Sequence, residues 1–278
     1  MSLMLKLLAI TVLSSNLLFS SATNAEIEEF LKEQFSGNKG LSSINVKVVE
    51  VMKLDRLKGW DAFIVSVEAN MKQQNKSRKV KQRMVWFSNG DAVTRDLIDL
   101  QTGESFVDLV KPDFKLEYYK KENLIYGNVN AKHKIAIFSD PLCPFCRSFV
   151  PSAIEKMKKR ADTFAIYYYH FPLERIHPAA VPLVQAAVAA ELKGVKDVVL
   201  NLYKVEVDPR EKNIQKILSA FNKAMKTNIK VSDLNTKEVL LHLNSDMSVA
   251  ENLMVGGTPT LYFDGKVDKT KRKFEMVK

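Results

Sequence analysis

The spacing of hydrophobic residues in the first half of the chain changes from helical to strand-like. Residues 26–35 carry apolar side chains at helical spacing, which predicts a short helix that ends near Gly37. Beyond it, apolar and polar residues alternate as in half-buried strands, at residues 44–48, 63–71, 84–86 and 93. The turn sequence Ser88–Asp91 predicts a hairpin before the last of these segments. We therefore expect a helix followed by an antiparallel sheet of about four strands.

From residue 132 onward the pattern is that of a layered fold. Residues 135–138 form a short apolar run, typical of a buried strand, and a helical stretch follows over residues 146–160. The remaining elements are expected as a strand at 164–171, helices at 178–192, 195–203, 211–225 and 236–254, and a strand at 260–263. Strand, helix, strand, helices and strand in this order describe an α/β layer fold. The fold class is α/β, or α+β over the whole chain.

These patterns divide the chain into two domains. Residues 26–129 form a helix-plus-sheet domain without a catalytic cluster, which we interpret as a module for binding or assembly. Its last part, residues 104–129, contains apolar–polar mixtures that predict either short strands or a linker. Residues 130–278 form the second domain, with a helical insert at about 172–254.

The N-terminal residues 1–25 have the layout of a secretory signal peptide. One positive charge, Lys6, precedes an apolar core of about a dozen residues, and small residues follow up to Ala25. Cleavage is expected after Ala22 or after Ala25, and the sequence does not choose between them. The alternative is an uncleaved anchor, but the apolar run is short for a membrane span and is interrupted by polar residues. We therefore predict export to the periplasm.

Composition and charge narrow the classes of partner. The formal net charge is +10, and lysines cluster at residues 72–83 and 266–278. Such clusters are compatible with nucleic acid or an anionic membrane, but they lack interleaved aromatic residues and a nucleic-acid motif. We interpret them as solvated segments and expect no nucleic-acid partner. About 250 residues remain after removal of the leader, enough for real cores without the help of a disulfide.

The candidate chemistry lies in a pair of cysteines, Cys143 and Cys146, which are the only two in the chain. A bridge that closes so short a loop stabilises the fold little, so the pair points to reactivity. We expect Cys143 at the end of a strand and the start of a helix, where the helix dipole favours the nucleophilic thiolate. Cys146, one turn further on and less exposed, can attack a mixed disulfide formed at Cys143. Pro144 suits the first helical turn.

Other uses of the cysteines fit less well. A zinc site needs two more ligands, and the four histidines lack ligand-like spacing within one element: His133, His170, His177 and His242. An inert structural disulfide remains an alternative. A hydrolase with one nucleophilic cysteine leaves the second thiol unexplained. We predict no metal and no cofactor.

A second segment, residues 255–260, reads Val-Gly-Gly-Thr-Pro-Thr before an apolar strand. The Thr258–Pro259 bond is a candidate for the cis form, but alone this segment predicts only a turn. Together with residues 138–146, Phe-Ser-Asp-Pro-Leu-Cys-Pro-Phe-Cys, it resembles the thioredoxin-fold Dsb family over about residues 124–265. The resemblance is greatest to DsbC and DsbG, with some DsbA-like features.

The resemblance implies a thioredoxin fold with a helical insertion, preceded by a small N-terminal helix-plus-antiparallel-sheet domain. It implies that Thr258 and Pro259 form a loop beside the thiols that holds an extended substrate, with Pro144 and Phe145 in the same substrate-binding set. Dimerisation through residues 26–129 is implied as well.

Several positions depart from the family pattern. Ile137 occupies the position six residues before the first cysteine, where many thioredoxins have a buried acid, so proton transfer at Cys146 must use water or another group. The segment from Phe171 to Pro178 resembles DsbA-like proteins, and we interpret His177 as a helix cap rather than a catalytic residue. A long helical linker before Lys132 and a final helix after Gly265 are not evident.

The function predicted from the sequence is thiol–disulfide exchange on exported cysteine-containing proteins, as an isomerase or reductase kept reduced by a DsbD-like membrane partner. The alternative is a DsbA-like oxidase served by a DsbB-like oxidant, and the direction of electron flow stays open. A more distant alternative is a holdase or assembly protein whose thiols are incidental.

Overall fold

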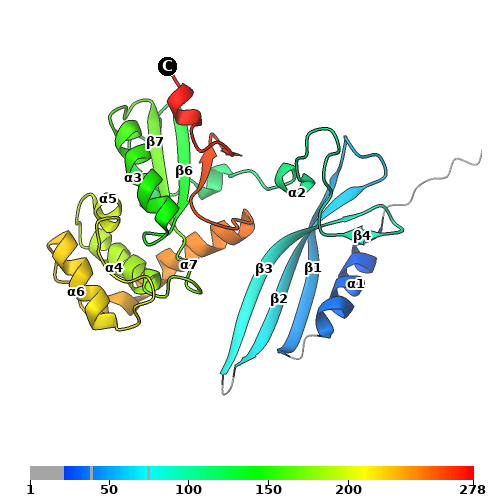
Figure 1. Ribbon diagram of the computed structural model, residues 1–278, viewed down its shortest axis with the longest axis horizontal. Helices are drawn as coiled ribbons and strands as arrows, with labels where there is room; N and C mark the ends of the chain where they lie inside the picture. The colour runs from blue at the N-terminus through cyan, green and yellow to red at the C-terminus, as the bar shows by residue number, and fades with distance from the viewer. Residues whose placement is uncertain (1–21, 38–39, 74–75) are drawn as a thin grey trace, which may run out of the picture. The chain divides into compact units, whose positions relative to one another are not determined.

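The computed structural model describes residues 22–37, 40–73 and 76–278 and divides the chain into two compact units, with the boundary in the sequence between Val110 and Lys111 (Figure 1). Most of the predicted signal peptide, residues 1–21, lies outside the described residues. The boundary expected at residues 129 and 130 falls inside the second unit. Within the described ranges, the helices are too short or too polar to cross a membrane.

The first unit is a four-stranded antiparallel sheet with a helix, as the sequence predicted. Helix α1 spans Asn24–Ser36, and the strands follow in sequence order across the sheet: β1 Leu41–Lys53, β2 Asp61–Gln73, β3 Lys76–Ser88 and β4 Val93–Thr94. The hairpin between β3 and β4 uses the predicted turn, because Ser88 pairs with Val93. Figure 1 shows α1 alongside this sheet.

Local capping and burial explain why α1 forms where it does. Thr23 precedes the helix, and its side chain accepts a hydrogen bond from the Glu26 backbone, while the Glu26 carboxylate accepts one from the Thr23 backbone. This capping box satisfies two backbone donors that a helix start otherwise leaves open. Ile27 and Leu31 are buried in a cluster with strand residues such as Val65.

The segment that leads into the second unit is built of short pieces. It contains α2 Phe106–Leu109, the 3-10 turns Leu116–Tyr118 and Lys121–Asn123, and β5 Leu124–Tyr126. Strand β5 pairs antiparallel with β7, so β5 belongs to the second sheet. The long linker helix that the sequence did not reveal is also not found in this described segment.

The second sheet has the strand order β5-β7-β6-β8-β9. Its further strands are β6 His133–Ser139, β7 Phe164–His170, β8 Thr260–Phe263 and β9 Lys266–Val267. Strands β6 and β7 are parallel, whereas β8 is antiparallel to β6. Because successive side chains of a strand point to opposite faces, Ile135 and Ile137 meet one helix layer while Ala136 and Phe138 meet the other.

Helices cover both faces of this sheet. Helix α3, Pro144–Lys158, supplies buried residues to the first cluster, and α7, Lys237–Asn252, supplies Val249 and Ala250 to the second. Between β7 and α7 the chain inserts further helices with a core of their own: α4 Ala180–Leu192, α5 Val198–Leu202 and α6 Ile214–Met225, followed by a 3-10 turn at Val231–Asn235. The fold is therefore a thioredoxin fold with a helical insertion.

Candidate functional site

The two thiols lie where strand β6 is followed by helix α3. Cys143 is the N-cap residue of α3, with an extended backbone, and Pro144 begins the helix. Proline costs little there because its missing N–H would have no partner inside the helix. Cys143 is 5% exposed and Cys146 is 0% exposed, so the second thiol is the more deeply buried. Both features match the arrangement expected from the sequence.

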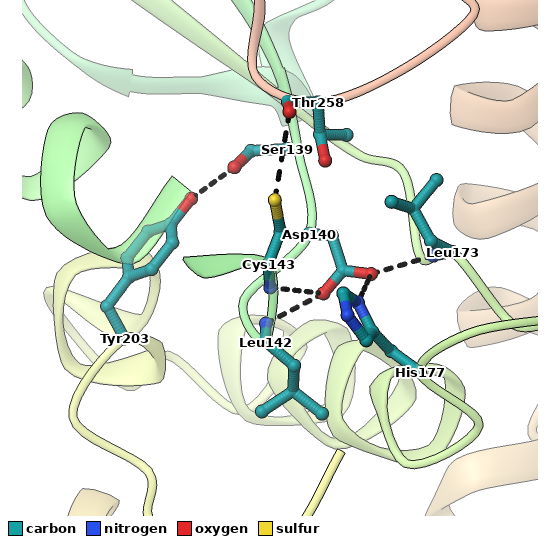
Figure 2. Close-up of polar contacts among 8 residues, drawn as sticks. All are labelled: Ser139, Asp140, Leu142, Cys143, Leu173, His177, Tyr203 and Thr258. Atoms are coloured by element: carbon teal, nitrogen blue, oxygen red, sulfur yellow. Dashed lines mark hydrogen bonds and ion pairs between the residues drawn. The ribbon is translucent and has the colours of Figure 1, made fainter. Parts of the chain in front are cut away.

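The loop before β8 lies against the first thiol. The Thr258–Pro259 peptide bond is cis, and the Cys143 Sγ lies 3.7 Å from the Thr258 carbonyl oxygen, toward which the thiol donates (Figure 2). Thr258 is half-buried and Pro259 is buried, whereas Pro144 is exposed. The fold thus brings together two segments that are 115 residues apart in the sequence.

Phe145, between the two thiols, is a highly exposed part of the site. Its aromatic side chain is 75% exposed although it is large and apolar. Burial of such a side chain against a partner stabilises the complex by roughly 25 cal/mol per Å² of buried apolar surface. Its position in the Cys143–Cys146 segment therefore suits contact with another polypeptide.

Asp140 is a site residue to which the sequence analysis gave no role. Its carboxylate is fully buried and accepts hydrogen bonds from the backbone N–H groups of Leu142, at 2.7 Å, and Cys143, at 3.2 Å. These bonds hold the turn that carries Cys143. An Asp before a proline is a typical start of a turn, and this signal in Asp140-Pro141 could have identified the residue.

The same carboxylate also binds the helical insertion to the turn formed by residues 140–143, here called the thiol turn. Its Oδ2 accepts from the Leu173 backbone at 2.8 Å and from the His177 Nδ1 at 3.0 Å (Figure 2). The interpretation of His177 as a helix cap is therefore wrong. Helix α4 begins at Ala180, and its N-cap is Ala179, whose methyl group accepts no hydrogen bond. The His177 imidazole instead donates a hydrogen bond to the buried Asp140 carboxylate.

The environment of Cys146 opposes its ionisation. Burial raises the pKa of the Cys146 thiol to about 11, and the hydroxyl of Ser139 and the backbone of Asp140 act in the opposite direction. The Thr258 Oγ1 is itself buried without a hydrogen-bond partner among the described residues. Ile137 occupies the position where many thioredoxins have a buried acid, and its fully buried, apolar side chain cannot exchange a proton with Cys146.

The comparisons with known proteins agree with this geometry. A family model described as Thioredoxin matches residues 120–278, which include both thiols and the cis-proline loop. The chain belongs to the thioredoxin family. The family resemblance expected from the sequence is confirmed at this level.

Among curated proteins, this thioredoxin-family chain is similar to two Na(+)/H(+) antiporters named NhaA 1. The one from Mycolicibacterium gilvum is 27% identical over 144 residues, which is 51% of this chain and 23% of the antiporter. The one from Mycolicibacterium vanbaalenii is 27% identical over 143 residues, with the same coverage of 51% and 23%. The chain thus spans about a quarter of the length of the curated relatives it matches.

Solved thioredoxin-like structures are also similar to the chain. A thioredoxin-like oxidoreductase from Silicibacter pomeroyi is 19% identical and covers 54% of this chain and 84% of its own, with a TM-score of 0.43. Oxidised BdbD from Bacillus subtilis is 15% identical and covers 60% and 92%, with a TM-score of 0.46. The thiol-disulfide exchange protein α-DsbA2 from Wolbachia pipientis is 18% identical and covers 54% and 81%, with a TM-score of 0.44.

The arrangement of the thioredoxin-family site suits sulfur chemistry. One thiol lies at a helix start, a second thiol is more deeply buried, and a backbone carbonyl and an exposed aromatic ring border the pair. In the described part of the chain, histidine, cysteine and acidic side chains do not gather in groups of three or more that could hold a metal ion. The chemistry open to these residues is exchange between thiols and disulfides.

Proposed function

We propose that the protein is an exported thiol–disulfide oxidoreductase in which Cys143 exchanges with a substrate sulfur and Cys146 resolves the mixed disulfide. The observation that carries this proposal is the contact between Cys143 Sγ and the Thr258 carbonyl at 3.7 Å. It supports the proposal because the Cys143 sulfur lies beside backbone that could pair with an extended substrate through main-chain hydrogen bonds. Thr258, Pro259, Pro144 and Phe145 form the proposed substrate-binding set.

The test removes the nucleophile. Cys143→Ser is expected to abolish both insulin reduction and the reactivation of scrambled ribonuclease, because serine cannot form a mixed disulfide. Ser152→Ala, an exposed position further along α3, is the matched control and is expected to keep both activities. Survival of both activities in Cys143→Ser would overturn the proposal and favour a holdase or assembly protein.

For the direction of electron flow, we favour an isomerase or reductase kept reduced by a DsbD-like membrane partner. The separate helix-and-sheet unit that ends at Val110 supports this choice, since it offers a second surface for substrate binding or assembly. Thiol trapping of Cys143 and Cys146 in the producing cells tests it. A mostly reduced pair is expected, and a mostly oxidised pair would contradict the isomerase.

A disulfide oxidase served by a DsbB-like oxidant is the second candidate. It is favoured by the segment from Phe171 to Pro178, which resembles DsbA-like proteins and contacts the thiol turn through Leu173 and His177. The same trapping experiment decides between the two. A difference of 30 mV in potential corresponds to about 1.4 kcal/mol, so modest changes at the thiols suffice to reverse the direction.

The proposed location is the periplasm, after removal of a leader that ends at Ala22. Cleavage there keeps Thr23 as the cap of α1, whereas cleavage after Ala25 removes the cap and the first helical residues. Such a cap stabilises a helix by about 1 kcal/mol. The intact mass of the exported protein is expected to correspond to a chain that begins at Thr23, and a chain that begins at Glu26 would contradict this assignment.

The first unit is proposed to form a homodimer. It presents several partly exposed apolar side chains on its strands: Val49, Val51 and Met71. Light scattering of the mature chain is expected to give twice the mass of one chain, and removal of residues 23–110 is expected to give a monomer. This deletion keeps β5, Leu124–Tyr126, in the second sheet. A mature chain that is monomeric would contradict the proposed role.

A further inference from the structure

Three buried hydroxyl groups, those of Tyr168, Tyr203 and Ser139, form a hydrogen-bonded chain. The Tyr203 hydroxyl donates to the Ser139 Oγ at 2.6 Å, and the hydroxyls of Tyr168 and Tyr203 lie 2.8 Å apart (Figure 2 shows the first of these bonds). All three residues are buried. They come from three elements, since Ser139 ends β6, Tyr168 lies in β7 and Tyr203 follows α5.

The hydrogen bonds of the chain have a defined direction. Tyr203 has one hydroxyl proton, which it gives to Ser139, so the proton between the two tyrosines comes from Tyr168. The Ser139 proton then remains for another acceptor. Burial raises the pKa of Tyr168 and that of Tyr203 well above the usual value, so both keep their protons across the neutral range.

The candidate acceptor for the Ser139 proton is the sulfur of Cys146. Burial raises the pKa of the Cys146 thiol, and the Ser139 hydroxyl acts in the opposite direction. Cys146, Tyr168 and Tyr203 belong to one buried cluster on the α3 side of the sheet. A chain of hydroxyls polarises each successive bond, so the terminal donor is stronger than an isolated serine.

We infer that Ser139 donates a hydrogen bond to the Cys146 thiolate as it forms, and that Tyr203 and Tyr168 are positioning residues that orient and strengthen this donor. The inference rests on the proposed function. It assigns a stabilising hydrogen bond, without proton transfer, to a hydroxyl chain at a site where Ile137 makes the position of the buried acid of many thioredoxins apolar.

The step served by this chain is the resolution of the mixed disulfide. The Cys146 thiolate attacks the Cys143 sulfur, the bond between Cys143 and the substrate sulfur breaks, and the Cys143–Cys146 bond forms. The substrate sulfur leaves with the electron pair and takes up the proton that Cys146 released. The hydroxyl chain gains and loses no proton, and it lowers the cost of charge on the buried sulfur.

The two thiols can be followed separately with 5,5′-dithiobis(2-nitrobenzoate). Attack by Cys143 releases one thionitrobenzoate in a first phase, and attack by Cys146 on the resulting mixed disulfide releases the second. For Ser139→Ala we expect the second phase at pH 8 to slow by about tenfold or more, which is the effect of losing a hydrogen bond to a charged group. For Tyr203→Phe we expect a slowing of about threefold.

The first phase is expected to change by less than about twofold in either variant. A purely structural role would not move the pH profile, whereas the inference predicts that the second-phase rate of Ser139→Ala shifts toward higher pH by about one unit, which is a tenfold change in thiolate fraction. Tyr262→Phe is the matched control, because its buried hydroxyl faces the Leu253 carbonyl in the cluster on the other side of the sheet. It is expected to leave both phases unchanged.

Two outcomes separate this inference from the proposed function. A second phase that stays within twofold of the native rate in folded Ser139→Ala and Tyr203→Phe would overturn the inference and leave the proposed function standing. A first phase that persists at the native rate in the Cys143→Ala variant would overturn the proposed function itself. Tyr203→Phe keeps the packing of the ring, so it carries the test should Ser139→Ala fail to fold.

Discussion

At the scale of single residues, the site depends on a few buried polar groups. Asp140 is fully buried, and each of its carboxylate oxygens accepts two hydrogen bonds. A buried carboxylate is tolerated only where such donors replace water. The residue stabilises the turn before Cys143 and, through Leu173 and His177, fixes the insertion against it.

Replacement of this carboxylate should therefore destabilise the second unit in a graded way. Asp140→Ala leaves four donors without their partner, and we expect the free energy of unfolding to fall by about 3–5 kcal/mol. Asp140→Asn keeps one carbonyl oxygen for the thiol turn and should lose less. Chemical denaturation followed by circular dichroism measures both, and equal losses in the two variants would contradict the assigned contacts.

A second buried carboxylate predicts how stability depends on pH. Asp246 is fully buried, accepts hydrogen bonds from the Asn123 side chain and the His170 backbone, and has its pKa raised by burial to about 8. Its pKa in the unfolded chain is about 3.9. Because the folded value is the higher one, the contribution of this group to stability is complete below about pH 4 and is lost as the pH rises toward 8.

The Asp246→Asn variant isolates this contribution. Whatever its absolute stability, its free energy of unfolding should fall less between pH 5 and pH 8 than that of the native chain, because the titrating group is gone. Denaturation curves at the two pH values give the slopes. Identical slopes for the two proteins would show that Asp246 titrates alike in the folded and unfolded states.

At the scale of elements, close backbone approach fixes the edge of the second sheet. Gly127 follows β5 with φ +86°, and a Cβ there would lie 2.0 Å from the Phe164 carbonyl oxygen at the start of β7. Both the conformation and the space require glycine. The contact sets how closely β5 can pack beside β7.

The Gly127→Ala variant should therefore lose about 2–4 kcal/mol of stability in the second unit. Gly194→Ala is the matched control, since Gly194 has φ +80° but its Cβ would meet no described atom within 4 Å, and it should lose about 1 kcal/mol. Circular dichroism follows the helices of this unit. Both tryptophans, Trp60 and Trp86, lie in the first unit, so their fluorescence midpoint should not move.

Much of the element order could be predicted from the sequence, because the spacing of hydrophobic residues indicates which face of a helix or strand is buried. Strand β8 has the predicted bounds, and the strand β7 differs by one residue. Helix ends were less accurate: residues 195–203 were expected as a helix, but α5 covers only Val198–Leu202. The helix starts after Asp197, whose backbone is left-handed, φ 54°, and whose carboxylate accepts hydrogen bonds from Tyr126 and Lys158, which are distant in the sequence.

At the scale of the whole molecule, the site is assembled from segments that the sequence places far apart. The thiol pair and the Thr258–Pro259 loop were recognisable because each is a local motif. The partners of the buried groups were not: Ser139 and Tyr203 are 64 residues apart, and Asp140 and His177 are 37 apart. Such contacts arise only when the insertion packs against the end of β6, and no local pattern records them.

The central claim is that Cys143 forms a covalent bond with a substrate sulfur and that Cys146 releases it. Intact mass spectrometry after incubation with oxidised glutathione tests this most directly, in the native chain and in Cys143→Ala and Cys146→Ala. The account predicts a stable adduct of one glutathione on Cys146→Ala, an internal disulfide without adduct in the native chain, and no adduct at the same protein concentration on Cys143→Ala. Modification of Cys143→Ala as readily as of Cys146→Ala would contradict the account.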